Sequence, residues 1–243
     1  MGFRVRAVNT ASDSENKIHD DQVAAHYGFR GALVPGVTVY GYLASAAVEH
    51  FGPEWLNRGA MDVRFHQPVY DGDDVEIAIE PDDAGRVRIE AGKCASGLAW
   101  LGDHASDYVD SGSHPVERKK PSAGTLAIGT VLGALRRPVA SEARMSAPLD
   151  ASIGGRAHPA LLLALANRIF VENYELGPWI HVSSEVRKFR AAKDGEIVDV
   201  RAKIVGRYER KGHEFVVLDV LLSGAEPIER VRHTAIWQPR MTR

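Results

Sequence analysis

The side chains best suited to chemistry gather in one stretch of the chain, from Ser14 to Tyr42. It opens with a polar segment made of Ser14, Glu15, Asn16, His19, Asp20 and Asp21. A histidine suits proton transfer near neutral pH, because its ordinary pKa lies close to 6.5. Gly36 then opens an apolar run, and the first N–H groups of a helix are unpaired donors at its positive end. The stretch therefore predicts an acid–base group, His19, close to backbone donors that could stabilise a negatively charged oxygen.

The elements that must position these groups follow from the spacing of apolar residues. Apolar side chains recur at helical spacing after Gly36 and predict a long helix from Val37 to about Phe51. Residues 3–9 alternate like a strand, and Asp21 is expected to cap a short helix over Gln22–Tyr27. Further strands are expected at Met61–Gln67, Asp74–Glu80, Arg86–Ala91, Ser96–Leu101 and Asp107–Asp110. The first half thus reads as a long helix followed by an antiparallel sheet.

The second half of the chain repeats this order of elements. One constant offset superimposes Glu49 on Glu172, Val63-Arg64 on Val186-Arg187, and Asp71-Gly72-Asp73 on Asp194-Gly195-Glu196. The second copy comprises the helix Pro159–Val171 and the strands Glu185–Arg190, Ile197–Val205, Glu214–Leu222 and Glu229–Trp237. Agreement in helix, turn and strand at a single offset indicates an internal duplication. Each copy leaves a sheet edge open, so we expect the two copies to pair.

Composition sets the boundaries between the copies. The run SGSHPVERKKPSAGT is rich in Ser, Gly, Pro and charge, which is typical of a linker. We therefore place an N-terminal unit at residues 1–112, a linker at 113–125 and a C-terminal unit at 126–243. The basic run RRPVASEAR, residues 136–144, is likewise expected to be solvated chain.

The polar segment before the first helix is not duplicated. The same offset places Glu142 opposite His19 and Arg137 opposite Ser14. Nothing like the sequence N-x-I-H precedes the second helix. We therefore expect one candidate site, in the N-terminal unit, and a degenerate counterpart in the C-terminal unit.

The motifs between residues 14 and 75 resemble those of a known family. SENKIHDD, then AxxxGFRGxxVPG, then FHQPVYDGDDVEI are similar to the signature of the MaoC-like dehydratases and (R)-specific enoyl-CoA hydratases. That signature is D-x-N-P-x-H-x-D, a loop, a glycine at a helix start, and later F-x-x-P-V-x-x-G-D. The resemblance implies an α+β double hot-dog fold, with two repeats that each wrap a curved antiparallel sheet around a long helix.

The resemblance also assigns roles to individual residues. His19 and Asn16 fall on the catalytic histidine and the motif asparagine of the family. Gly36 falls on the glycine whose backbone N–H is implied to bind the thioester oxygen. Lys17 replaces the motif proline, and Ser14 replaces the aspartate that shares activation of water with the histidine. The implied activity is that of a lyase, which hydrates an enoyl-CoA or dehydrates a 3-hydroxyacyl-CoA with His19, Ser14 and Asn16 as its catalytic group.

The expected helix should also contact the acyl chain. Val37 and Tyr40 are the candidates for lining an acyl pocket. By analogy with double hot-dog proteins, a second half without its own site would widen the pocket for a bulky or long acyl group. His66, His158 and His181 are further polar candidates, without an assigned role.

Two other functions stay open at this stage. A hot-dog thioesterase would activate water with a helix carboxylate such as Glu49, although its match to Glu172 favours a structural role for both. A non-catalytic acyl-CoA binding protein would be consistent with Ser14 in place of aspartate. The sequence names neither the acyl chain nor its carrier, which could be CoA or an acyl carrier protein.

The overall composition excludes several other classes of function. The chain is 44% hydrophobic and 26% charged with a net charge of −2, which gives no reason to expect nucleic-acid or membrane binding. Its one cysteine, Cys94, excludes an internal disulfide and a thiolate zinc cluster, and the histidines lack metal-ligand spacing. Phosphate-loop, dinucleotide and serine-hydrolase motifs are absent from the sequence.

The expected partner is therefore a small-molecule acyl thioester, with no separate cofactor and no metal. A homodimer stays open. No apolar run approaches the ~20 residues of a membrane helix, and the N-terminus lacks the apolar core of a signal peptide. We expect a cytoplasmic protein.

Overall fold

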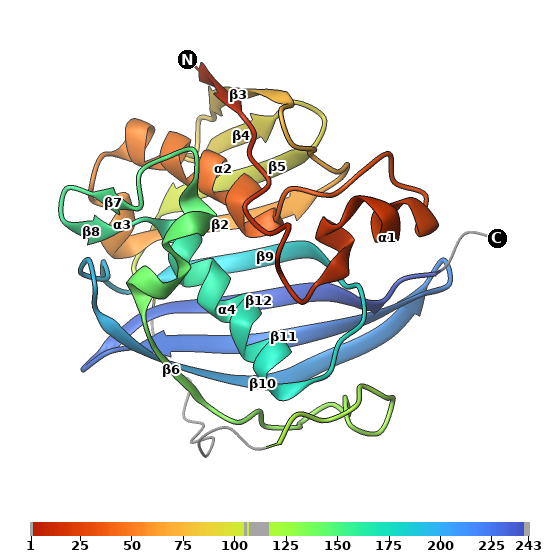
Figure 1. The fold of residues 1–243 in the computed structure, drawn as a ribbon. Helices are drawn as coiled ribbons and strands as arrows, with labels where there is room; N and C mark the ends of the chain where they lie inside the picture. Colours follow the sequence, from red (N-terminus) through yellow and green to blue (C-terminus); the bar gives the residue numbers. More distant parts are fainter. Residues whose placement is uncertain (1, 105, 107–116, 241–243) are drawn as a thin grey trace.

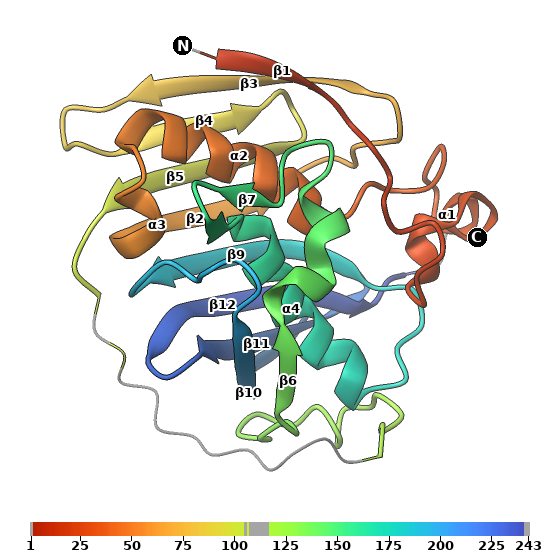
Figure 2. The same cartoon turned by 60° about the vertical axis from the view of Figure 1, so that its left-hand side comes forward.

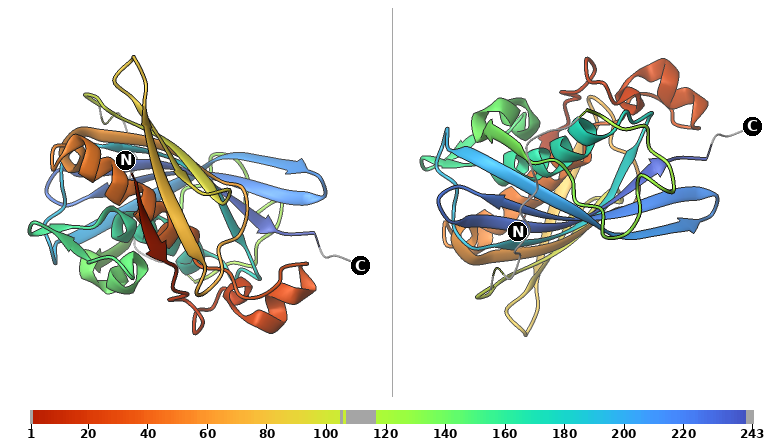
Figure 3. Two further views of the ribbon diagram at one scale, coloured as in Figure 1. Left: turned by 90° about the horizontal axis from the view of Figure 1, so that it is seen from above. Right: turned by 90° about the horizontal axis from the view of Figure 1, so that it is seen from below.

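The computed structural model describes residues 2–104, 106 and 117–240 of the chain. Ten strands form one sheet in the order β1-β3-β4-β5-β2-β9-β12-β11-β10-β6 (Figures 1 and 2). The strands are β1 (Gly2–Arg6), β2 (Gly59–Phe65), β3 (Asp74–Pro81), β4 (Val87–Ala91), β5 (Ala95–Leu101), β6 (Leu135–Pro138), β9 (Ile180–Lys188), β10 (Ile197–Arg210), β11 (His213–Ser223) and β12 (Pro227–Gln238). The sheet is strongly twisted, so its two ends run in different directions (Figure 3).

Short helices and two long ones complete the described fold. They are η1 (Lys17–His19), α1 (Asp21–His26), α2 (Gly36–Phe51), α3 (Trp55–Arg58), η2 (Val139–Ser146) and α4 (Pro159–Asn173). The strands β7 (Ser152–Ile153) and β8 (Arg156–Ala157) form a separate small hairpin. The long helices α2 and α4 lie on the same face of the sheet (Figure 2).

The sheet confirms the internal duplication. Outward from its centre, β2 and β9 are followed by β5 and β12, β4 and β11, β3 and β10, and β1 and β6. The two halves join where β2 and β9 pair antiparallel, from Ala60 opposite Arg187 to Arg64 opposite Ser183. Within the described residues, each half therefore contributes five strands to this sheet and one long helix, and the 3-10 helices η1 and η2 precede the two long helices.

The basic run at residues 136–144 was wrongly expected to be solvated chain. Its first residues belong to β6, where Arg136 pairs with Asp199 and Arg137 with Val198 of β10. The rest forms η2, in which Val139 and Glu142 are buried. Charged residues at a sheet edge hide the strand signal, because their side chains stay in solvent while the backbone pairs.

Most other expected elements are confirmed with shifted ends. The long strands of the C-terminal half extend beyond their predicted bounds, and β9 begins at Ile180 rather than at Glu185. Asp20, not Asp21, caps α1, since its carboxylate accepts from the Val23 N–H at 3.0 Å. The helix α3 was not predicted. The strand expected at Asp107–Asp110 lies outside the described residues.

Small residues on α2 allow a close helix–helix contact. A Cβ placed on Gly41 would lie 3.0 Å from the Ala160 Cβ of α4 and 3.2 Å from the His158 ring. The Ser45 hydroxyl, one turn further along α2, lies 2.9 Å from His158 Nε2. At Gly41 and Ser45, α2 therefore lies directly against the start of α4.

A buried ion pair joins two neighbouring strands in the second half of the sheet. Lys188 on β9 binds the Glu229 carboxylate on β12, and both side chains are almost completely buried. The Lys188 Nζ also lies 5.3 Å from the centre of the Trp55 ring on α3. Burial raises the pKa of Glu229, and the charge of Lys188 partly opposes that shift.

Removing one partner of this pair should destabilise the fold strongly. We expect Lys188→Met to lower the free energy of unfolding by about 3–5 kcal/mol, because Glu229 is left as an uncompensated buried charge. Urea denaturation measures the change. The double variant Lys188→Met/Glu229→Met is the control and should recover most of the loss; a double variant no more stable than the single one would contradict this explanation.

Candidate functional site

The segment before α2 places the predicted acid–base residue. Asn16 begins η1, and its Oδ1 accepts from the Ile18 N–H at 3.4 Å. Ile18 is buried in a small cluster with Ala24 and Leu33, which anchors η1 against the loop that leads into α2. The Asn9 side chain also donates to the His19 carbonyl at 3.2 Å. These contacts therefore fix the backbone of His19 in the segment that precedes α2.

The His19 ring has a defined proton arrangement. Its Nδ1 lies 2.6 Å from the Leu33 carbonyl oxygen. A carbonyl oxygen can only accept, so Nδ1 carries the proton and Nε2 keeps its lone pair. Burial lowers the pKa of His19, and the hydrogen bond to Leu33 partly opposes the shift. The imidazole is thus neutral at pH 7, with Nε2 available as a base.

Asn16 connects His19 to the second half of the chain. Its Nδ2 donates to the Trp179 carbonyl at 3.0 Å and lies 3.5 Å from His19 Nε2. Its Oδ1 accepts from the Trp179 N–H at 3.1 Å. The side chain therefore ties η1 to the start of β9 and lies directly beside the catalytic nitrogen expected of His19.

Ser14 lies in the same segment, but its hydroxyl is engaged locally. The Oγ donates to the Asn16 carbonyl at 3.2 Å, and the Ser14 N–H donates to the Ala11 carbonyl. These are the contacts of a turn residue. A hydroxyl can still accept a hydrogen bond from water, but unlike the aspartate of the family motif it carries no negative charge.

The N-terminus of α2 is open. Pro35 precedes the helix and supplies no side-chain cap. The first helical N–H groups bonded to Pro35 are those of Thr38 and Val39, which leaves the N–H groups of Gly36 and Val37 without an acceptor among the described residues. Such donors at the positive end of a helix dipole suit a negatively charged oxygen.

Gly36 has a second, steric reason to be glycine. A Cβ at this position would lie 3.0 Å from His181 Nδ1 and 3.2 Å from His181 Cβ. The His181 ring cannot easily move away, because Phe65 and His233 pack against it with ring centres at 4.6 and 4.2 Å. The start of α2 is therefore packed directly against His181.

Enlarging Gly36 should disturb this arrangement. We expect Gly36→Ala to lower the free energy of unfolding by about 1–3 kcal/mol, because the new methyl group overpacks against His181. It should also lower turnover of any thioester bound at the α2 N-terminus, which a parallel activity assay would detect. Gly177→Ala is the matched control, since a Cβ there has no neighbour within 4 Å. Equal stability of the two variants would contradict the steric argument.

The equivalent end of α4 is closed. His158 caps the helix, with its Nδ1 accepting from the Ala160 N–H at 3.2 Å, and Pro159 at the first position has no N–H. Burial and the nearby charge of Lys188 lower the pKa of His158 to about 4. The second helix start therefore offers no free donors comparable to those of Gly36 and Val37.

One cavity of about 580 Å³ joins these groups. Ser14, Asn16, His19, Gly36 and Val37, which the sequence predicted, all line it. Tyr40 does not: it is fully buried in the core and is absent from the lining, so its assignment to the acyl pocket was wrong. The thioesterase candidate Glu49 is exposed on α2 and is also absent from the lining.

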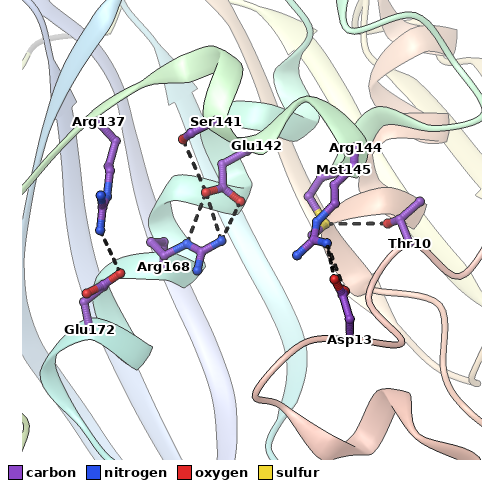
Figure 4. Close-up of polar contacts among 9 residues, drawn as sticks. All are labelled: Thr10, Asp13, Arg137, Ser141, Glu142, Arg144, Met145, Arg168 and Glu172. Carbon is purple, nitrogen blue, oxygen red and sulfur yellow. Dashed lines mark hydrogen bonds and ion pairs between the residues drawn. The ribbon is translucent and has the colours of Figure 1, made fainter.

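Charged residues of the second half line another part of the cavity. Glu142, opposite His19 in the repeat, is buried and binds Arg168 through both carboxylate oxygens, at 3.1 and 3.2 Å (Figure 4). Further ion pairs join Arg144 to Asp13 and Arg137 to Glu172 on either side of it (Figure 4). The degenerate counterpart of the His19 site is therefore an ion pair rather than an apolar wall.

Sequence reasoning left a buried histidine chain without a role. His181 Nε2 lies 2.8 Å from the Ser184 Oγ, which in turn lies 3.2 Å from His233 Nδ1. Burial lowers the pKa of His233 to about 3 and that of His181 well below its usual value, with the neighbouring His233 adding to the shift at His181. The only sequence signal was that His181 is a polar residue within the apolar run WIHV.

Other kinds of site find little support in the described residues. Among them, no three His, Cys, Asp or Glu side chains come together as metal ligands. In the same part of the chain, no helix is both long and apolar enough to cross a membrane.

Comparison with known proteins identifies the fold. No protein-family profile matches the chain, and no curated protein matches its sequence. Solved structures do match over almost the whole chain. A structure described as a putative MaoC domain protein dehydratase from Chloroflexus aurantiacus J-10-fl has a TM-score of 0.60 at 9% identity, and the match covers 99% of this chain and 96% of that one.

Two further structures extend this likeness. A conserved hypothetical protein of Mycobacterium tuberculosis, described as having a double hot-dog fold, gives a TM-score of 0.55 at 14% identity, covering 97% of this chain and 96% of its own. A structure described as an oleoyl thioesterase (putative) from Lactobacillus plantarum gives a TM-score of 0.55 at 12% identity, and the match covers 98% of this chain and 96% of that one. The chain therefore has the α+β double hot-dog fold, as the sequence resemblance predicted, and this fold is shared by dehydratases and thioesterases.

Proposed function

We propose that the chain is an acyl-thioester hydratase or dehydratase whose reaction centre lies between His19 and the N-terminus of α2. One observation carries the proposal: a neutral histidine, whose unprotonated Nε2 has Asn16 Nδ2 at 3.5 Å, and the two unpaired N–H groups of Gly36 and Val37 line the same cavity. These are the base and the oxyanion donors that addition of water to an enoyl thioester requires.

The chemistry can be written with His19 as the only proton carrier. In hydration, Nε2 takes a proton from water while the water oxygen bonds to C3 of the enoyl group. The electron pair of the C2–C3 double bond moves toward the thioester, and the resulting enolate oxygen accepts hydrogen bonds from the Gly36 and Val37 N–H groups. The His19 imidazolium then returns its proton to C2, which restores the neutral histidine.

Ser14 changes this scheme relative to the family motif. Without the aspartate, no carboxylate at this position can share activation of the water. His19 then performs both proton transfers, and loss of one acid–base partner is expected to cost about 10²–10⁴ in rate. Asn16, held by the backbone of Trp179 just before β9, is the residue that we expect to orient His19 Nε2 or the attacking water.

A direct assay tests the proposal and separates it from hydrolysis. Loss of the enoyl absorbance of crotonyl-CoA without release of free thiol supports hydratase activity. Thiol release supports a thioesterase, the activity assigned to one structural neighbour. Neither signal, together with measurable affinity for a CoA ester, would replace the proposal by a non-catalytic binding function.

A further inference from the structure

The cavity is chemically divided between the two halves of the chain. Beside His19 and the start of α2, its wall includes apolar side chains such as Val37, Val39 and Ile180. On α4, the residues Ala164, Asn167, Arg168, Val171 and Glu172 line the cavity at the spacing of one helix face. Three of these five, Asn167, Arg168 and Glu172, carry hydrogen-bonding groups, so the second-half wall is polar.

Asn167 has an unmet hydrogen-bonding capacity. Its Oδ1 is buried and has no partner among the described residues. Buried side-chain polar atoms in folded proteins normally have a partner, and an exception calls for an explanation such as a ligand or an ordered water. The residue lines the cavity, so a bound molecule can provide that partner.

The neighbouring Arg168 offers a hydrogen-bond donor, and its positive charge is neutralised by Glu142. Its Nε and Nη2 bind Glu142, and Nη1 has no acceptor among the described residues. The other arginines in the lining are also neutralised, Arg118 by Glu15 and Arg144 by Asp13, each at 2.9 Å. Because each of these cations already has a carboxylate, the wall favours a neutral polar group over a second anion.

An alkyl chain would fit this wall poorly. It would cover Arg168 Nη1 and leave Asn167 Oδ1 still unpaired, and desolvated unpaired polar groups are costly. A site built to hydrogen-bond a substrate group discriminates strongly against the analogue that lacks it.

We propose that this surface, formed by Asn167 and the Glu142–Arg168 pair, binds a neutral oxygen on the acyl chain, a hydroxyl or a ketone remote from the thioester. Arg168 donates to that oxygen, and a hydroxyl can in turn donate to Asn167. The inference rests on the proposed function for the location of the thioester. It assigns the substrate class as oxygenated acyl thioesters rather than simple fatty acyl thioesters.

Binding of unreactive CoA thioethers tests the inference without turnover. Calorimetry compares an alkyl chain with chains of equal length that carry a hydroxyl at successive positions, and with one that ends in a carboxylate. In the wild type, we expect one hydroxylated analogue to bind at least about tenfold more tightly than the alkyl analogue. Equal affinities, or tightest binding by the carboxylate, would overturn the proposal.

Variants then locate the effect. Asn167→Leu should abolish the preference for the hydroxylated analogue, and Asn167→Ala serves if the leucine variant does not fold. Gln67→Leu makes the same amide-to-apolar change elsewhere in the cavity lining and should keep the preference. A preference that survives in both Asn167 variants, or that is lost equally in Gln67→Leu, would refute the assignment.

The outcome is independent of the hydratase assay. Selective binding without turnover of a 2-enoyl-CoA that carries the preferred hydroxyl would leave this inference standing and remove the proposed function. Turnover with unselective binding would do the reverse.

Discussion

Replacing His19 by glutamine should lower kcat/KM for crotonyl-CoA hydration by about 10²–10⁴, with the loss mainly in kcat. Glutamine can keep a hydrogen bond to the Leu33 carbonyl, where His19 Nδ1 now donates at 2.6 Å. It has no nitrogen that can take a proton from water. The variant therefore removes proton transfer while retaining the contact that holds the segment in place.

The pH dependence of the wild type should carry the same signature. Burial lowers the pKa of His19 below its usual value of 6.5. Because the neutral form is the base, activity should be constant around neutral pH and fall only as acidification protonates Nε2. Any residual activity of His19→Gln should lack that acid limb.

A matched variant separates this effect from general damage. His50→Gln makes the same change on an exposed position near the end of α2, outside the cavity lining. It should retain wild-type kcat/KM. If His19→Gln retained activity comparable to His50→Gln, His19 would not be the acid–base group and the proposed reaction centre would be wrong.

The architecture could be predicted from the sequence because apolar residues recur at regular spacing in both copies of the repeat. The helices α2 and α4 and the inner strands bury regular stripes, and both copies show them at one offset. The strand β6 was not predicted, because its Arg136 and Arg137 side chains stay exposed while the backbone pairs with β10. Edge strands need little burial, so periodicity carries little information about them.

The candidate site was only partly predictable for a related reason. His19, Asn16 and Gly36 are close in sequence, so a local motif brings them to notice. The partners that complete the site come from the other half: Trp179 binds Asn16, and His181 packs against Gly36. Such contacts arise from the pairing of β2 with β9, which no local pattern encodes.

Tyr40 shows the opposite error. Its place on the first turns of α2 suggested an acyl-chain contact, but the helix is covered on more than one side. The Tyr40 hydroxyl is buried without a partner among the described residues, and burial together with the charge of Glu229 raises its pKa well above the usual value. A residue's distance from a helix start does not reveal which face the cavity meets.

Acidification from pH 7 to pH 5 should lower the free energy of unfolding by about 4 kcal/mol through two buried histidines. The folded-state pKa is about 4 for His158 and about 3 for His233, because burial disfavours their charged forms. In the unfolded chain both titrate near 6.5. As the pH falls below that value, the unfolded state binds protons that the native state does not bind. The free energy of unfolding therefore decreases.

The size of the effect follows from the width of the window. At pH 5 each unfolded histidine is almost fully protonated while each folded one is mostly neutral, so about 1.5 pH units contribute about 2 kcal/mol per histidine. His181, whose pKa burial also lowers, adds in the same direction. Glu229 acts in the opposite direction, since its raised pKa lets the native state take up a proton first.

Substitutions test which side chains cause the change in the free energy of unfolding with pH. His158→Gln should remove about 2 kcal/mol of the loss between pH 7 and pH 5, measured by urea denaturation at several pH values. Its stability at pH 7 should also fall, because the cap on the Ala160 N–H is weakened. Ser45→Ala is the control: it removes the 2.9 Å partner of His158 Nε2 but keeps the titrating ring, so its pH slope should stay close to that of the wild type.

The same experiment bears on why the second helix start cannot act as a site. In the native state His158 Nδ1 must stay unprotonated to accept from the Ala160 N–H, so the cap and the low pKa express one arrangement. A His158→Gln variant with an unchanged pH slope would show that this histidine is protonated or solvated in the folded chain. The α4 N-terminus would then be open, and the contrast with the free donors of Gly36 and Val37 would no longer hold.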